Sequence, residues 1–144
     1  MTCWTNQRVN GSGIVQWTAD GVGACTSSGN QREPGVISDA TGGGILVWDD
    51  YRSGNWDIYG YDMTQTQEFV ICNDAGNQER PVIAGDWVAW QDDRNGNWDI
   101  YCYDLSTDTE KRLTSSPATQ SSPAISGTNV VYEDNRNGNW DIYC

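Results

Sequence analysis

A six-residue string, Gly-Asn-Trp-Asp-Ile-Tyr, occurs three times in this sequence, at residues 54–59, 96–101 and 138–143. Each copy begins 42 residues after the one before it. A second marker, Gln-x-x-Pro, begins at Gln31, Gln78 and Gln120, so its first interval is 47 residues and its second is 42. The longer interval indicates an insertion, which we place near the glycine run 42–44. A constant period of this length predicts a stack of similar supersecondary units.

The middle unit divides into four short strands separated by turn residues. The expected strands are 81–84, 87–91, 98–104 and 110–114. Between the second and third strands, Asn95-Gly96 supplies the positive φ angles of a tight hairpin turn. Four antiparallel strands in a unit of this length are typical of a propeller blade. The predicted fold class is all-β, with β-propeller-type four-stranded antiparallel blades and three blade equivalents.

The third strand of the unit is apolar on both of its faces. Side chains alternate along a strand, which puts Ile100 and Cys102 on one face and Tyr101 and Tyr103 on the other. A strand with one solvated face would alternate with polar residues. We therefore expect each blade to be buried between two neighbours, with the polar strand 110–114 at the outer edge.

We expect a single domain over residues 1–144, with a tail or partial strand at 1–13 and units at 14–62, 63–104 and 105–144. Residues 14–26 align with the fourth strand of a blade, because Cys25 and Cys72 lie at the same place before the Gln marker. Propellers close with about four to eight blades. Two alternatives follow: another chain completes the open blade head to tail, giving a ring or filament, or the chain is part of a larger propeller.

The segment Asp93-Arg94-Asn95-Gly96-Asn97-Trp98-Asp99-Ile100-Tyr101 and its two copies resemble TolB-type, or WD40-like, β-propeller repeats of bacterial secreted and cell-surface proteins. The Gln-x-x-Pro marker and the Trp-x-x-Asp strand ends belong to the same resemblance, which covers about residues 30 to 144. The earlier residues resemble a related class of secreted bacterial repeat proteins. The resemblance implies a protein-binding or surface module. Its usual ring has six or more blades, more than this chain supplies.

Composition excludes several functions. The net charge of −12 disfavours nucleic acid and an anionic membrane as partners, and no apolar window reaches the ~20 residues of a membrane span. The absence of histidine removes a Ser-His-Asp or Cys-His centre. Carboxylate pairs such as Asp49-Asp50 recur at each hairpin, as structural residues do. We expect no enzymatic activity and no cofactor apart from a structural calcium ion.

The hairpin between the second and third strands is the candidate calcium site. In the last unit Glu133, Asn135, Asn137 and Asp141 surround Gly138 with the spacing of a calcium loop. The alternative is that an arginine in each loop pairs with the aspartate of the repeated string, which closes the loop without a metal. The residues of this structural alternative are Arg52, Arg94 and Arg136, with Trp56-Asp57, Trp98-Asp99 and Trp140-Asp141. The tryptophans are expected to pack between blades, although tryptophan rims also bind sugars and proteins.

Five cysteines in an acidic chain favour an extracellular or cell-surface location with disulfides. The candidate interface residues are Trp4 and Trp17, which lie outside the regular repeat, with Cys3, Cys25 and Cys144. A disulfide from Cys144 to Cys25 of another chain would lock a head-to-tail joint; small buried thiols are the alternative. The predicted function is a non-catalytic structural protein that assembles with itself. The second hypothesis is a protein- or glycan-binding module within a larger secreted propeller.

Overall fold

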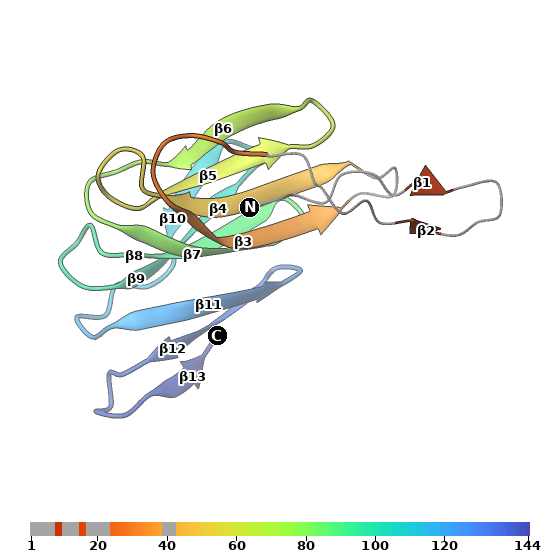
Figure 1. Ribbon diagram of the computed structural model, residues 1–144. Helices are drawn as coiled ribbons and strands as arrows, with labels where there is room; N and C mark the ends of the chain where they lie inside the picture. Colours follow the sequence, from red (N-terminus) through yellow and green to blue (C-terminus); the bar gives the residue numbers. More distant parts are fainter. Residues whose placement is uncertain (1–7, 10–14, 17–23, 39–42) are drawn as a thin grey trace.

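The computed structural model describes residues 8–9, 15–16, 24–38 and 43–144 (Figure 1). All regular elements of this part of the chain are β-strands. They are β1 (Arg8–Val9), β2 (Val15–Gln16), β3 (Gln31–Ser38), β4 (Gly44–Asp50), β5 (Asp57–Asp62), β6 (Gln67–Cys72), β7 (Gln78–Ala84), β8 (Trp87–Asp92), β9 (Asp99–Asp104), β10 (Thr109–Arg112), β11 (Gln120–Ser126), β12 (Asn129–Asp134) and β13 (Asp141–Tyr143).

The strands form three antiparallel blades and one small hairpin. The first blade has the order β3-β4-β5-β6, the second has β7-β8-β9-β10, and the third has β11-β12-β13. Figure 1 shows the three sheets side by side in chain order, with the β1–β2 hairpin extending from one end. The predicted all-β fold with propeller-type blades is confirmed. In the first two blades the fourth strand comes from the next predicted unit, so a sheet spans a unit boundary.

The Gln-x-x-Pro marker forms a β-bulge at the start of the first strand of each blade. In the second blade the register shifts between Glu79 and Val82, and Arg80 has a φ of 57°. Glu33 and Ser122 have the same left-handed conformation before their prolines. Proline has no N–H group to donate to the ladder, and a bulge removes the need for that bond. The strand expected at 81–84 therefore begins earlier, at Gln78.

The core lies between adjacent blades. Val47, Ile58 and Ile71 of the first blade pack in one cluster with Val88, Trp90 and Tyr101 of the second. Both faces of β9 are buried, since Ile100 is 0% and Tyr101 6% exposed. This is the two-sided burial that the apolar pattern predicts for a blade with two neighbours.

The outer strand β10 is exposed along its whole length, as its polar sequence predicts. Trp98 precedes β9 rather than beginning it, because the strand starts at Asp99. Within the expected leading strand 14–26, the described residues 15–16 form β2, which pairs with β1. Among the described residues there is no helix with the length and apolarity needed to cross a bilayer.

Candidate interaction site: the arginine network and the open third blade

An arginine in the hairpin loop of the second blade is held by its own sheet. Arg94 donates its backbone N–H to Oδ1 of Asp92 at 3.0 Å and its Nε to Oδ2 at 2.9 Å. The indole of Trp90 donates to the same Oδ2 atom at 3.0 Å. The guanidinium lies 4.3 Å above the centre of the Tyr101 ring, which is a cation–π distance. Asp92 is fully buried, so the arginine and indole neutralise and solvate its charge.

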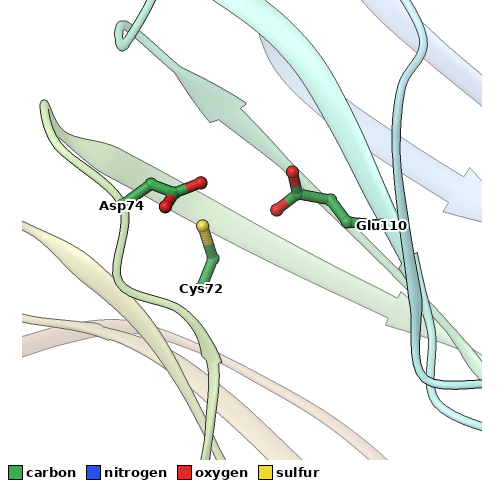
Figure 2. Close-up of side chains that lie close together, drawn as sticks. All are labelled: Cys72, Asp74 and Glu110. Atoms are coloured by element: carbon green, nitrogen blue, oxygen red, sulfur yellow. The ribbon is translucent and has the colours of Figure 1, made fainter.

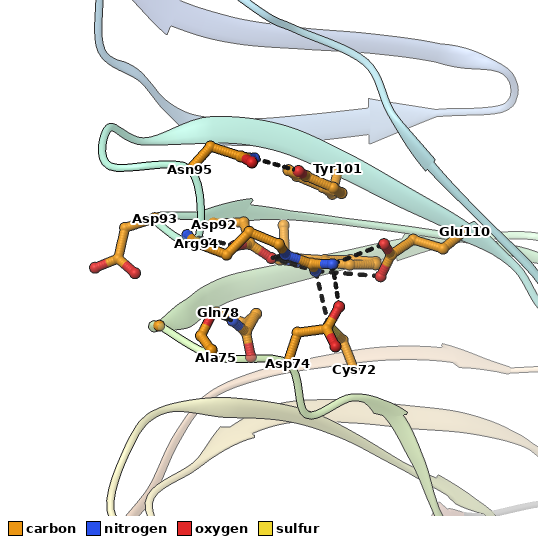
Figure 3. A network of polar contacts seen from close by, with 12 residues as sticks. Cys72, Asp74, Ala75, Gln78, Asp92, Asp93, Arg94, Asn95, Tyr101 and Glu110 are labelled. Atoms are coloured by element: carbon orange, nitrogen blue, oxygen red, sulfur yellow. Dashed lines mark hydrogen bonds and ion pairs between the residues drawn. The ribbon is translucent and has the colours of Figure 1, made fainter.

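The same guanidinium joins two outer strands. Arg94 donates to Glu110 of β10 at 2.9 Å and to the Sγ atom of Cys72, at the end of β6, at 2.9 Å. It also pairs with Asp74 in the loop after β6 (Figure 3). Since β6 belongs to the first blade and β10 to the second, Arg94 connects neighbouring blades.

The first blade repeats this arrangement. Arg52 pairs with Asp50 at 2.6 Å and with Glu68 of β6 at 2.5 Å, and it lies 4.0 Å above the Tyr59 ring. Its Nη2 atom donates to Sγ of Cys25 at 3.1 Å. Burial acts to raise the pKa of Asp50, but hydrogen bonds from Arg52 and Trp48 outweigh it and lower that pKa. Cys25 therefore makes the contact with the first blade that Cys72 makes with the second.

In the third blade the network is smaller. Arg136 donates its Nε to Asp134 at 2.9 Å and lies 4.2 Å above the Tyr143 ring. A hydrogen bond from Arg136 lowers the pKa of Asp134. Over the described ranges, Asp134 is the one carboxylate paired with Arg136. The Arg136 side chain is 38% exposed, against 15% for Arg94.

These partners differ from the ones that the sequence predicted. The arginines pair with Asp50, Asp92 and Asp134, two residues before them, and not with the aspartate of the repeated string. The reason is the tight turn: the backbone N–H and the guanidinium of the arginine both reach back to the carboxylate at the end of the preceding strand. The spacing aromatic-x-Asp-x-Arg, repeated three times, is the signal that would have identified these pairs.

The aspartates of the repeated string have other partners. Asp57 accepts from Asn55 at 2.8 Å, and Asp99 pairs with Arg112 at 2.7 Å. Asp141 accepts from Asn137 at 3.1 Å and from Asn139 at 2.6 Å.

In the predicted calcium loop, the side-chain oxygens of Asp141 and Asn135 are already hydrogen-bonded. Both Asp141 oxygens accept from amides of the loop, and Oδ1 of Asn135 accepts from the backbone of Thr119 at 3.0 Å. The backbone of Glu133 pairs with that of Ile142 in the ladder of β12 and β13. An ion would have to displace the bonds of Asp141 and Asn135, so these two residues favour the closed loop. Calcium at Glu133, Asn135, Asn137 and Asp141 stays a prediction.

One other cluster has the composition of a metal site. Ligand atoms of Cys72, Asp74 and Glu110 lie within 4.8 Å of one another (Figure 2). The guanidinium of Arg94 binds all three, so their positive partner is already present. Burial also raises the pKa of Cys72 to about 12, which keeps the thiol neutral, whereas metals bind the thiolate. The cluster fits an arginine-binding role and not a metal.

The outward face of the third blade is exposed at positions that are buried in the other two. Ile58 and Ile100 are 0% exposed, but Ile142 at the same position in the repeat is 73% exposed. Val131 is 38% exposed, whereas Ala89 at its position is 0%. Trp140 beside them is 55% exposed, although core packing was predicted for it. We call Val131, Trp140 and Ile142 the open face.

The cysteines of the described residues are free thiols. Cys72 and Cys102 are buried, Cys25 is half-buried and Cys144 is exposed. The predicted disulfide between Cys144 and Cys25 joins two chains, so it stays a prediction. Cys3, Trp4 and Trp17 lie outside the described residues.

The first strands of the three blades line a groove of about 540 Å³. The bulge residues Glu33, Arg80 and Ser122 lie along it, one from each blade. Arg80 donates to the hydroxyl of Ser122 at 3.2 Å. Non-glycine residues with positive φ are strained, and such strain gathers at binding sites. The groove is a second candidate site.

The described structure is similar to solved TolB proteins. It matches the protein assigned as TolB in Agrobacterium tumefaciens with a TM-score of 0.64 and 19% identity, over 77% of this chain and 40% of that one. It matches TolB from Acinetobacter baumannii with a TM-score of 0.60 and 22% identity, over 87% of this chain and 32% of that one. No protein-family model matches the sequence, and no curated protein is significantly similar to it. The chain thus has the fold of three TolB-like propeller blades and spans less than half of either TolB chain.

Proposed function

We propose that this chain is a non-catalytic extracellular structural protein whose copies join head to tail, with the open face of the third blade packed against the first blade of the next copy. The observation that carries this proposal is the contrast between Ile142, 73% exposed, and its fully buried counterparts Ile58 and Ile100. An aliphatic side chain in this repeat position is covered wherever a following blade is present. Burying an exposed isoleucine stabilises an interface by about 1.5–3 kcal/mol.

The front of the first blade supports the same arrangement. The contact between Cys25 and Arg52, at 3.1 Å, repeats the contact that Cys72 makes across a blade boundary. Cys25 therefore occupies, beside the first blade, the place that Cys72 at the end of β6 occupies beside the second. The first blade carries Cys25 where a fourth strand ends, and the third blade has three described strands. These two surfaces are complementary. Such head-to-tail contacts close into rings or continue as filaments.

The mass of the assembled species tests this function. Light scattering of the wild-type chain is expected to give a multiple of 16.0 kDa, and Ile142→Ser is expected to shift the mass towards 16.0 kDa. Lys111→Ser is the control, because Lys111 is exposed on β10 of the second blade, which supplies neither surface of the proposed joint. A wild-type chain with a mass of 16.0 kDa at every concentration would contradict the proposal.

The groove favours a second candidate function, a protein- or glycan-binding module within a larger propeller. Its support is the strained trio of Glu33, Arg80 and Ser122, which brings an acid, a base and a hydroxyl to one surface. NMR titration with peptides and oligosaccharides tests it: binding should shift the amide resonances of these residues. Shifts confined to other surfaces would count against it.

A further inference from the structure

A cleft of about 430 Å³ lies between the first two blades. The apolar residues that line it and also pack against the buried core are Ile45, Phe69, Tyr103 and Leu105. The backbone N–H of Leu105 donates to the carbonyl of Asp86 at 2.8 Å, which ties together two turns of the second blade beside the cleft. Both blades have four strands, so complete sheets form the two walls.

Three aspartates share this cleft with the apolar residues. Asp62 ends β5, Asp86 lies in the turn after β7, and Asp108 lies in the turn after β9. Asp62 accepts from two backbone N–H groups of its own turn, and Asp108 accepts from the hydroxyl of Tyr103. Within the described ranges none of the three forms an ion pair, and the Asp86 carboxylate has no hydrogen bond. Their negative charge is therefore not balanced by the chain, in contrast to the aspartates that bind the loop arginines.

The three carboxylates do not form a metal site. Among the described residues, the one group of possible metal ligands that lie within 4.8 Å of one another is Cys72, Asp74 and Glu110. The aspartates of the cleft are farther apart, so they cannot surround one small ion. Negative charges placed around an apolar surface suit a larger cation with a hydrocarbon body. The rings of Phe69 and Tyr103 add cation–π attraction for its charged group.

The charge of this cleft comes from its own residues and not from the blade architecture. A second cleft, of about 370 Å³, lies between the second and third blades. There Lys111 has the repeat position of Phe69, and Thr128 has the repeat position of Asp86. A cation thus replaces an aromatic ring, and an uncharged hydroxyl replaces a carboxylate. The combination of aromatic rings and unpaired carboxylates belongs to the first cleft.

We infer that the cleft between the first two blades binds a small alkylammonium or arylammonium ion, with its hydrocarbon part on Phe69 and Tyr103 and its ammonium group beside Asp86. An apolar surface of this volume with a few polar groups is typical of small-molecule sites. The net charge of −12 attracts cations to the whole chain, and the cleft adds the apolar contact that selects among them. This goes beyond the proposed assembly, which uses the open face and the side of the first blade that carries Cys25.

NMR titration of the whole chain with 2-phenylethylammonium and with 2-phenylethanol tests the inference. The two probes share a hydrocarbon body, and one has an ammonium group where the other has a hydroxyl. Both should shift the resonances of Phe69, Tyr103 and Leu105. The ammonium probe should bind about 5–10-fold more tightly, as expected for an ion pair together with a cation–π contact. Physiological salt screens most of the long-range attraction to the acidic chain.

Asp86→Thr, which introduces the residue of the third blade, should weaken binding of the ammonium probe about 2–4-fold and leave binding of 2-phenylethanol unchanged. Unchanged binding of the neutral probe shows that the cleft is intact. The matched control is Asp104→Asn, which makes the same change in net charge at a residue outside the cleft. Its turn is kept, because asparagine can also accept the hydrogen bonds from Ser106.

The control variant should bind both probes as the wild-type chain does. Three results would overturn the inference. The first is equal affinity of the two probes for the wild-type chain, and the second is a set of shifts that lies outside the cleft. The third is an Asp86→Thr chain that binds the ammonium probe no more weakly than Asp104→Asn does.

Discussion

Cys72 at the end of β6 accepts a hydrogen bond from Arg94 of the next blade, with 2.9 Å between Sγ and Nη2. Cys25 has the same relation to Arg52, at 3.1 Å. A thiol is a weak acceptor, but each lies beside a guanidinium that also binds carboxylates, two in the case of Arg52 and three in the case of Arg94. The blades are thus joined by a polar contact at the outer strand as well as by the apolar core.

The arginine network predicts a stability difference between Arg94→Gln and Arg136→Gln. Arg94 is 15% exposed and pairs with the fully buried Asp92, whose charge would be left without a cationic partner. The expected loss in unfolding free energy is about 3 kcal/mol for Arg94→Gln, and a smaller loss is expected for Arg136→Gln because its side chain is more exposed. Urea denaturation of the two variants measures it, and equal losses would contradict the network as described.

The buried Asp49 predicts a pH dependence of stability. Burial raises the pKa of Asp49 to about 6, although a hydrogen bond from Arg32 opposes the shift. Its Oδ1 atom has no hydrogen-bond partner, so the folded state favours the protonated form. Because the folded pKa exceeds the unfolded value of 3.8, this contribution to stability is complete below pH 3.8 and is lost as the pH rises through about 6.

Asp49→Asn should remove that pH dependence. The unfolding free energy of the variant, relative to the wild type, should rise by on the order of 2 kcal/mol between pH 4 and pH 7. Urea denaturation over this pH range measures the difference. If the difference in unfolding free energy between the variant and the wild type stays constant over this pH range, Asp49 has the same pKa in the folded and unfolded states.

Gly60 predicts a packing conflict within the first blade. The other two units have Cys102 and Cys144 at this position, but a Cβ atom on Gly60 would lie 2.5 Å from Cζ of Phe69. Gly60→Cys should therefore lower the unfolding free energy by about 1–3 kcal/mol through overpacking. Phe69→Leu in the same chain should recover part of the loss, since it removes the ring. Thermal unfolding of the two single variants and the double variant measures this, and strict additivity would refute it.

The exposed thiol predicts covalent oligomers under oxidising conditions. Cys144 is exposed and Cys25 is half-buried, whereas Cys102 is 4% exposed. Non-reducing electrophoresis should show species larger than one chain that disappear with reductant and in Cys144→Ser. Cys102→Ser should leave them unchanged. A wild-type chain that stays monomeric with free thiols would contradict the predicted joint.

The periodic sequence determined the blades by itself. The repeat of 42 residues, the Asn-Gly turn and the two apolar faces of 98–104 depend on local periodicity, which survives without knowledge of contacts. The buried pairing of neighbouring blades followed from the same pattern, because a strand that is apolar on both faces needs two neighbours.

Only the tertiary structure decided the partners of the charged residues. Several carboxylates lie close to Arg94 in the sequence. In the fold, Arg94 pairs with Asp92, Asp74 and Glu110, whereas Asp99 pairs with Arg112. Glu110 lies 16 residues from Arg94, and the side-by-side strands bring them together. Such choices depend on register and side-chain direction across strands, and these are set by packing over the whole sheet.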